Sequence, residues 1–359
     1  MWHWRSSTDF RLLELLVAGK ADQVAAVLDQ RAALGLTMVR VLGSCWTSVS
    51  GPFNLNWQDG IRVAPTLCDM ARARGLYVEI TVFGATAAPE FKGTDYAAVL
   101  QAYDDATYLH DNVVIEGANE PDHGSQDDAI IPVIQSWRPR TPGRLYCPGA
   151  EHGSDDWRTD RFCGGHFVNR HGDRKNAEDG WREIRHKKDF EADSGKLDLP
   201  FHDDEPGRSH QDPAKWSILG VMHRAMPLGI CYHSGAGIHS ELFTGIELQC
   251  AQAFIDGCRI VDDAASYDHK DTGHSNSIVG FYGLAPWEDS RSGWPQDPNN
   301  YASRVFAAVG TGGPSLLYTI GEKGNCPFGL QHGWKIDQQL ADWPSTSAGY
   351  HCRVWTITT

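Results

Sequence analysis

The chain has 359 residues and a formal net charge of −14, with nine cysteines and no Cys-x-x-Cys pair. Phosphate binding needs clustered Lys and Arg, so this acidic balance argues against a nucleic-acid partner. The cysteines fit neither a zinc site nor a complete disulfide framework, and buried thiols are the expectation.

No apolar run approaches the roughly 20 residues of a membrane span, so we expect no membrane partner. The first residues, Met1 to Arg5, lack the basic and apolar regions of a signal peptide. A cytoplasmic, a phage-associated and a leader-processed secreted protein all fit these observations. The oligomeric state leaves no signature in the sequence.

Apolar patterning predicts alternating strands and helices over the first 260 residues. In chain order we expect a strand with its loop over 2–10, helices over 12–17 and 23–34, a strand over 38–43, a helix over 61–74, a strand over 76–83, a helix over 96–110, a strand over 113–120, a helix over 130–137, strands over 144–147 and 166–171, a helix over 181–190, a strand over 197–202, a helix over 215–225, a strand over 229–233 and a helix over 248–259.

These eight strands repeat at roughly the spacing of βα units, which implies a parallel sheet with right-handed crossovers. The predicted fold class is α/β, a (β/α)₈ barrel over residues 1–262. The composition then changes, and strands are expected over 304–309, 315–320 and 352–357 with Gly-rich turns between them. Residues 263–359 are therefore predicted to form a small antiparallel β appendage.

Two glutamates stand where strands of this barrel should end. Glu120 follows the β-branched run Val113-Val114-Ile115, and both Glu120 and Glu205 precede a proline, which stops strand pairing. The 85 residues between them match about three βα units, so both should lie at the carboxyl ends of strands, on the fourth and seventh. Two carboxylates facing one cleft are the pair needed to cleave a glycosidic bond.

Asn119-Glu120-Pro121 on the fourth strand, with a second Glu on the seventh, resembles the retaining glycoside hydrolases of clan A, the cellulase and mannanase type. The resemblance covers roughly residues 1–260. It implies that Glu120 is the general acid/base and Glu205 the nucleophile, acting on a β-linked polysaccharide or glycoconjugate without a cofactor. It also implies that Asn119 binds the sugar 2-hydroxyl and that Arg40 orients the nucleophile.

Other residues at the predicted strand ends are candidates for sugar contacts: His166, His171, His233 and Trp46. The seventh strand is more acidic than the resemblance leads one to expect. Asp203 and Asp204 are therefore alternative candidates for the second catalytic carboxylate, in place of Glu205. The eighth strand has Tyr232 and His233 where such enzymes often place a tryptophan. Sugar, linkage and exo or endo action therefore stay open.

Two further hypotheses belong to other classes. Histidines at the strand ends, together with Asp203 and Asp204, could hold a metal that activates water, although no His-x-His or His-Glu-x-x-His signature is present. Alternatively, the barrel binds carbohydrate without cleaving it. Fold alone does not decide among these hypotheses, because barrels host many chemistries.

Overall fold

The computed structural model describes residues 4–47, 53–87, 91–124, 126–150, 165–171, 201–206, 211–222, 229–264, 279–280, 304–308, 315–322, 335–344 and 350–358. The helix predicted over 181–190 lies outside these residues. The described chain divides into two compact units, residues 1–209 with 226–244 and residues 210–225 with 245–359.

The first unit is built on one sheet of eight strands. They are β1 (Trp4–Thr8), β2 (Met38–Leu42), β5 (Tyr77–Phe83), β6 (Val113–Ala118), β7 (Leu145–Gly149), β8 (Val168–His171), β9 (Phe201–Glu205) and β10 (Gly229–Tyr232). All their pairings are parallel, and β1 pairs with both β2 and β10. The order β7-β6-β5-β2-β1-β10-β9-β8 is that of eight successive barrel strands, with β7 and β8 at its ends.

A backbone contact links these two ends of the order. The N–H of His166, two residues before β8, donates to the Tyr146 carbonyl in β7 across 2.7 Å. Because parallel strands point their carboxyl ends the same way, residues that follow β6 and β9 share one rim of the sheet.

Five helices follow the early strands in the first unit: α1 (Leu12–Val17), α2 (Ala21–Leu34), α3 (Trp57–Arg72), α4 (Tyr96–Ala106) and α5 (Ile130–Ser136). Two of these helices begin with a side-chain cap: Oδ1 of Asn56 accepts from the Asp59 N–H at the start of α3, and Oδ1 of Asp95 accepts from the Ala98 N–H at the start of α4. Gly35 ends α2 with a left-handed φ of 98°. The short helix α8 (Gly235–Ile238) follows β10.

The hairpin of β3 (Cys45–Thr47) and β4 (Phe53–Leu55) was not predicted from the sequence. It lies between β2 and α3, on the side of the carboxyl ends of the barrel strands. Its short strands lack the apolar periodicity from which the longer elements were predicted.

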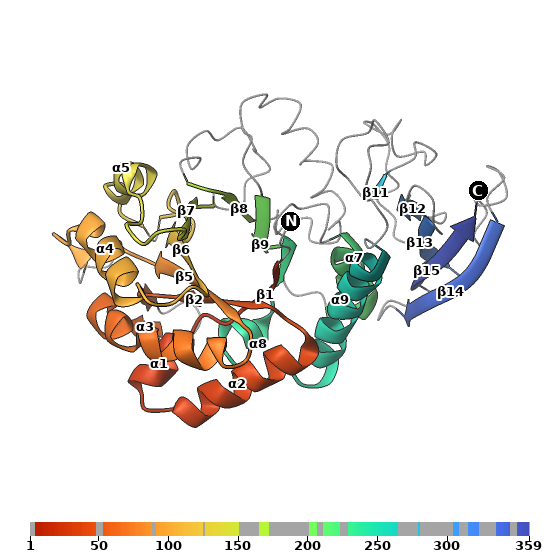
Figure 1. Cartoon of the computed structure of the whole chain (residues 1–359), viewed down its shortest axis with the longest axis horizontal. Helices are drawn as coiled ribbons and strands as arrows, with labels where there is room; N and C mark the ends of the chain where they lie inside the picture. The colour runs from red at the N-terminus through yellow and green to blue at the C-terminus, as the bar shows by residue number, and fades with distance from the viewer. Residues whose placement is uncertain are drawn as a thin grey trace. The chain divides into compact units, whose positions relative to one another are not determined.

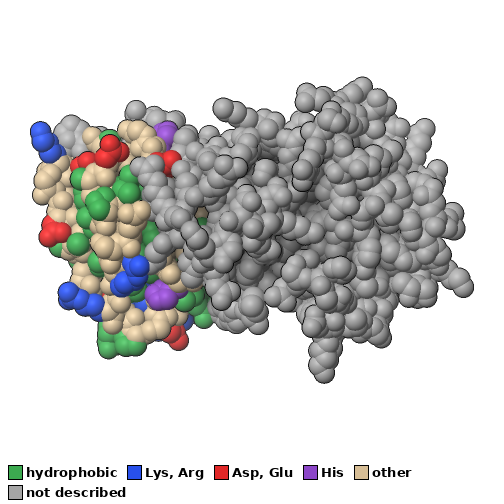
Figure 2. All heavy atoms as spheres, turned by 90° about the horizontal axis from the view of Figure 1, so that it is seen from above, with side chains coloured by type: hydrophobic (Ala, Val, Ile, Leu, Met, Phe, Trp, Pro, Cys, Tyr) green, Lys and Arg blue, Asp and Glu red, His purple; other side chains and the backbone are tan. Residues whose placement is uncertain are grey.

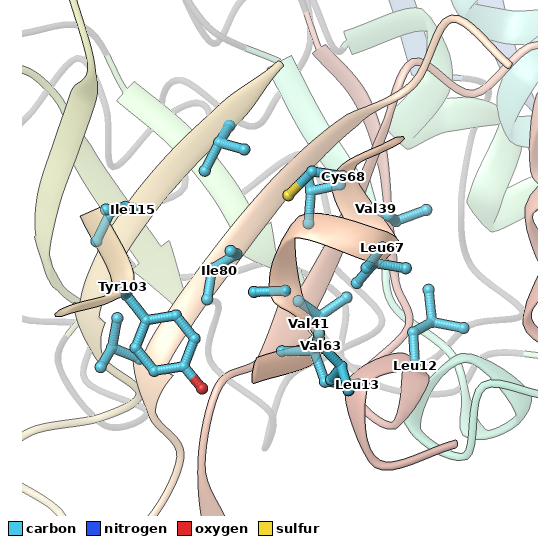
Figure 3. Close-up of a cluster of buried hydrophobic side chains, with 14 of the residues drawn as sticks. Leu12, Leu13, Val39, Val41, Val63, Leu67, Cys68, Ile80, Tyr103 and Ile115 are labelled. Carbon is cyan, nitrogen blue, oxygen red and sulfur yellow. The ribbon is translucent and has the colours of Figure 1, made fainter. Parts of the chain in front are cut away.

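The helices cover the sheet through a continuous apolar core. Figure 1 shows α2, α3 and α4 along one side of strands β2, β5 and β6. Figure 3 shows side chains of α1 and α3, such as Leu13 and Leu67, packed with Val41 and Ile80 of the strands. All four are less than 1% exposed. Apolar burial at about 25 cal/mol per Å² is the main term that holds such a layer on the sheet.

The second unit contains helices α7 (Pro213–Met222) and α9 (Gly245–Ala264) and one antiparallel sheet. The strands of this sheet are β11 (Val279–Gly280), β12 (Arg304–Ala308), β13 (Ser315–Glu322), β15 (Tyr350–Thr358) and β14 (Lys335–Pro344), in that spatial order. The two helices, expected as parts of the barrel, group with these strands. A division of the chain at residue 262 stays a proposal.

On the face drawn in Figure 2, Lys and Arg side chains are interspersed with Asp, Glu and apolar side chains over the described residues. Among the helices that the structure describes, none is both long enough and apolar enough to cross a membrane.

Candidate active site at the carboxyl ends of the barrel strands

Glu120 is placed by the end of β6. The strand stops at Ala118, and the Asn119 N–H still donates to the Phe83 carbonyl of β5 across 2.8 Å. Glu120 then has a φ of 45°, in the left-handed region that residues other than glycine rarely adopt. Pro121 follows this turn directly, and the Glu120 side chain is buried at 7% exposure.

Glu205 is the last residue of β9, and an irregularity in the strand determines which way it points. Asn169 pairs with His202 and Arg170 with Asp203, but His171 pairs with Glu205, so β9 has one extra residue at this point. Side chains alternate along a strand, and one added residue reverses that alternation. Glu205 therefore lies on the same side as His171 and is 2% exposed.

The two glutamates come together with His171. One ligand atom of each of Glu120, His171 and Glu205 lies within 4.8 Å of the other two. Nδ1 of His171 is 3.1 Å from Oε1 of Glu120, and its Nε2 is 3.8 Å from Oε1 of Glu205. The predicted pair of carboxylates thus shares one buried site, with an imidazole between them.

Arg40 of β2 donates hydrogen bonds to both Glu205 and Asn119. Its Nη1 donates to Oε1 of Glu205 across 2.7 Å, and its Nη2 donates to Oδ1 of Asn119 across 2.9 Å. Its Nε and Nη2 also donate to Oε2 of Glu116, at 3.0 and 2.7 Å. A buried guanidinium in contact with a carboxylate favours its charged form, so this contact favours an ionised Glu205.

His233, directly after β10, lies near the second carboxylate oxygen of Glu205. Its Nε2 is 3.9 Å from Oε2 of Glu205, and its Nδ1 is 2.7 Å from Oγ1 of Thr8 in β1. The ring is 1% exposed. His233 thus occupies the position on the eighth strand where the resemblance leads one to expect a tryptophan, and it faces the carboxylate.

His166 and Trp46 lie in other settings. The Tyr146 N–H donates to Nδ1 of His166 across 3.1 Å, near the amino end of β7 and away from the rim where Glu120 lies. These contacts make His166 a link between β7 and the residues before β8, outside the proposed site. Trp46 lies in the β3–β4 hairpin opposite Asn54, and its side chain is outside the described structure.

Buried polar residues of the barrel strands, which the sequence pattern did not predict, lie next to the site. Glu116 accepts from Arg40 and from the Thr81 hydroxyl. Asn169 donates to Glu79 across 2.8 Å and contacts His202, whose other ring nitrogen is 2.9 Å from Oγ of Ser6. A charged residue inside an apolar strand, as in Val-Val-Ile-Glu-Gly-Ala, was the signal that could have revealed Glu116.

Two carboxylates and an imidazole are also a donor set that can bind a divalent cation. A metal held by Glu120, His171 and Glu205 would share the Glu205 carboxylate with the Arg40 guanidinium at 2.7 Å. Repulsion between the two cations disfavours this arrangement. The geometry fits a pair of catalytic carboxylates better than a metal centre.

Comparisons with known proteins identify similar folds. A glycoside hydrolase family 5 structure from Bacteroides vulgatus ATCC 8482 superposes with a TM-score of 0.59 and 13% identity, over 99% of this chain and 88% of that chain. A GH5_18 structure from Bifidobacterium longum subsp. infantis gives a TM-score of 0.54 and 12% identity over 72% and 79%. A GH5_18 structure from Streptomyces cattleya in complex with GlcNAc gives 0.51 and 14% over 73% and 81%.

No family model and no curated protein matches the sequence. The structural similarities confirm the predicted (β/α)₈ barrel and its resemblance to the clan A type of fold. At 10–14% identity they describe the fold, and the roles of individual residues have to be argued from this chain.

Proposed function

We propose that this chain is a retaining glycoside hydrolase, with Glu120 as the general acid/base and Glu205 as the nucleophile. The observation that carries the proposal is the approach of the two buried carboxylates, each with an oxygen within 4.8 Å of the other and of His171. Retaining enzymes hold their carboxyl groups about 5–5.5 Å apart, whereas inverting enzymes need about 6.5–9.5 Å to admit a water.

The different partners of the two glutamates support the assignment of roles. Glu205 accepts from Arg40, and a nucleophile must be ionised. Glu120 lies 3.1 Å from Nδ1 of His171, which can either accept its proton or donate to it. A group that gives up a proton and later takes one back is well placed beside such an imidazole.

The reaction would then run in two steps. A Glu205 oxygen bonds to the anomeric carbon while the glycosidic bond breaks, and the Glu120 proton goes to the leaving oxygen. A water then replaces Glu205 at that carbon and gives its proton to Glu120, which restores both residues. Asn119, whose Oδ1 is occupied by Arg40, would donate from its NH₂ group to the sugar 2-hydroxyl.

For the substrate we propose a β-linked polysaccharide or glycoconjugate. Two similar structures contain sugars, namely Manβ1-4GlcNAc in a GH5_18 variant from Streptomyces cattleya and mannosyl-fructose in a mannosidase variant from Rhizomucor miehei. Aryl β-mannosides, aryl β-glucosides and Manβ1-4GlcNAc are therefore the first compounds to test.

The test is hydrolysis of this panel by the wild type, Glu120→Gln and Glu205→Gln, with the exposed Glu241→Gln as the matched control. We expect the wild type and the control to cleave at least one compound and the Glu205 variant to lose turnover. Proton NMR should show the first product with the β configuration of the substrate.

Other results would reject the proposal. Turnover retained by Glu205→Gln would move the nucleophile to Asp203 or Asp204. A wild type that binds a sugar but cleaves none would favour a non-catalytic binding barrel. Loss of activity after treatment with a chelator, restored by a divalent metal, would favour the metal-dependent hydrolase.

A further inference from the structure

The loop that follows Glu120 returns to the site through Gln126. This side chain is 6% exposed and crosses from the loop to the end of β5. Its Nε2 lies 2.6 Å from the Asn119 carbonyl, 3.2 Å from the Gly84 carbonyl and 3.4 Å from the Phe83 carbonyl. One amide group thus contacts both the residue before Glu120 and the end of the neighbouring strand β5.

The orientation of this amide is determined by its neighbours. Oγ1 of Thr86 accepts from the Asp127 N–H across 2.9 Å, so its hydroxyl proton is available to Oε1 of Gln126, 2.8 Å away. Carbonyl oxygens can only accept, so the NH₂ group has to face the three carbonyls. A flipped amide would place oxygen against oxygen at 2.6 Å.

Glu120 needs such support because of its backbone conformation. A φ of 45° at a residue with a side chain persists only where the surrounding structure holds it. The Asn119 N–H donates to the Phe83 carbonyl, and the Asn119 carbonyl accepts from Gln126. Both backbone polar groups of the residue before Glu120 are therefore hydrogen-bonded. The His123 N–H also donates to the Glu120 carbonyl across 2.9 Å.

We propose that Gln126 is a positioning residue for the acid/base Glu120, an inference that rests on the function proposed above. By holding the Asn119 carbonyl against β5, Gln126 keeps the Glu120 carboxyl beside His171 and within reach of the leaving oxygen. It acts through the backbone and does not touch the reacting atoms. A small displacement of a catalytic group can lower the rate by about 100-fold.

The experiment compares two substrates of the same sugar, a 2,4-dinitrophenyl and a phenyl β-glycoside. The sugar is mannose or glucose, whichever the wild type cleaves. Dinitrophenolate leaves without a proton, whereas phenolate needs one from Glu120, and kcat/KM reports the first bond cleavage in both cases. For Gln126→Leu we expect kcat/KM to fall by about 100-fold on the phenyl substrate. On the dinitrophenyl substrate it should change little.

A second variant provides a pH signature that a purely structural role would not give. In Gln126→Glu, the ionised carboxylate faces three carbonyls and cannot donate, but the protonated form can donate one hydrogen bond. The loss of kcat/KM on the phenyl substrate, measured relative to the wild type at each pH, should therefore become smaller as the pH is lowered. The exposed Gln23→Leu and Gln23→Glu are the matched controls.

The outcomes separate this inference from the proposed function. Equal losses on both substrates, or no loss on either, would overturn the role of Gln126, provided that Glu120→Gln shows the leaving-group dependence. A wild type that cleaves neither substrate and no other β-glycoside would reject the proposed function and this inference with it. If Gln126→Leu does not fold, the pH dependence of Gln126→Glu decides.

Discussion

Arg40 donates to Glu205 across 2.7 Å, although the two residues are 165 positions apart in the chain. The contact joins the second barrel strand to the seventh, and both side chains are almost completely buried. Arg40 donates at the same time to Glu116 and Asn119. One guanidinium therefore contacts both the nucleophile and the residue before the acid/base Glu120. This arrangement depends on the planar shape of arginine as well as on its charge.

Arg40→Lys should therefore lower kcat/KM strongly, although the positive charge is kept. A lysine ammonium cannot reach Glu116, Asn119 and Glu205 in the same geometry. We expect a loss of at least about 10-fold, which corresponds to about 1.4 kcal/mol of transition-state stabilisation. The control is Arg62→Lys, in which an exposed arginine paired with Asp59 is replaced. Equal activity of the two variants would contradict the role given to Arg40.

His166 should make stability depend on pH. Partial burial, and then the charge of Arg138, lower the pKa of His166 below its usual 6.5, although the residue as a whole is exposed. The unfolded chain therefore takes up this proton at a higher pH than the folded chain does. The contribution of His166 to stability is present above pH 6.5 and is lost as the pH falls through the lowered pKa.

The replacement His166→Asn offers a carbonyl oxygen to the Tyr146 N–H but does not titrate. Urea unfolding at pH 7 and pH 5 should show a smaller loss of stability on acidification for this variant than for the wild type. An equal loss in the two proteins would show that His166 is not the group responsible.

Buried thiols should resist alkylation in the folded protein. Burial raises the pKa of Cys45, Cys68 and Cys250 to about 12. At pH 8 only about one in 10⁴ of these thiols is the reactive thiolate. Peptide mapping after iodoacetamide treatment should find all three unlabelled in the native protein and labelled after denaturation. Rapid native labelling of Cys68 would contradict the packing of α3 on the sheet.

Gly60→Ala should destabilise the barrel even though alanine is the better helix former by about 1 kcal/mol. An added Cβ would lie 2.0 Å from the Tyr103 hydroxyl and 2.3 Å from the Gly43 carbonyl, and these two groups are hydrogen-bonded to each other. Overpacking of this kind costs about 1–3 kcal/mol. Thermal unfolding measures the change.

Gly124→Ala is the control, since its Cβ would meet no atom within 4 Å. The midpoint temperature of thermal unfolding of this variant should stay close to that of the wild type. A Gly60 variant as stable as this control would mean that the contact of α3 with Tyr103 is looser than the structure shows.

The spacing of the strands was enough to place both glutamates. The βα period puts Glu120 after the fourth barrel strand and Glu205 at the end of the seventh, as the structure does. Periodicity could not decide between Glu205 and its neighbours Asp203 and Asp204, because the extra residue in β9 reverses the alternation of side chains. Such an irregularity is set by pairing with β8, which a local pattern does not contain.

The supporting residues were missed for related reasons. Gln126 lies in a loop without apolar periodicity, and its role depends on carbonyls about 40 positions away in the chain. His166 looked like a rim residue because it stands beside a strand, yet it contacts the amino-terminal half of β7. A sequence pattern locates a strand but does not show at which end of the neighbouring strands an adjacent side chain lies.

The most direct test of the proposed mechanism is to trap the glycosyl-enzyme. A 2-deoxy-2-fluoro β-glycosyl fluoride of the cleaved sugar slows both steps and leaves with little need for an acid, so the covalent intermediate should accumulate. Mass spectrometry of the intact protein and of its peptides should then find one sugar, attached to Glu205. A label on Asp203 or Asp204, or no label on a protein that still hydrolyses its substrate, would contradict the assignment of Glu205 as the nucleophile.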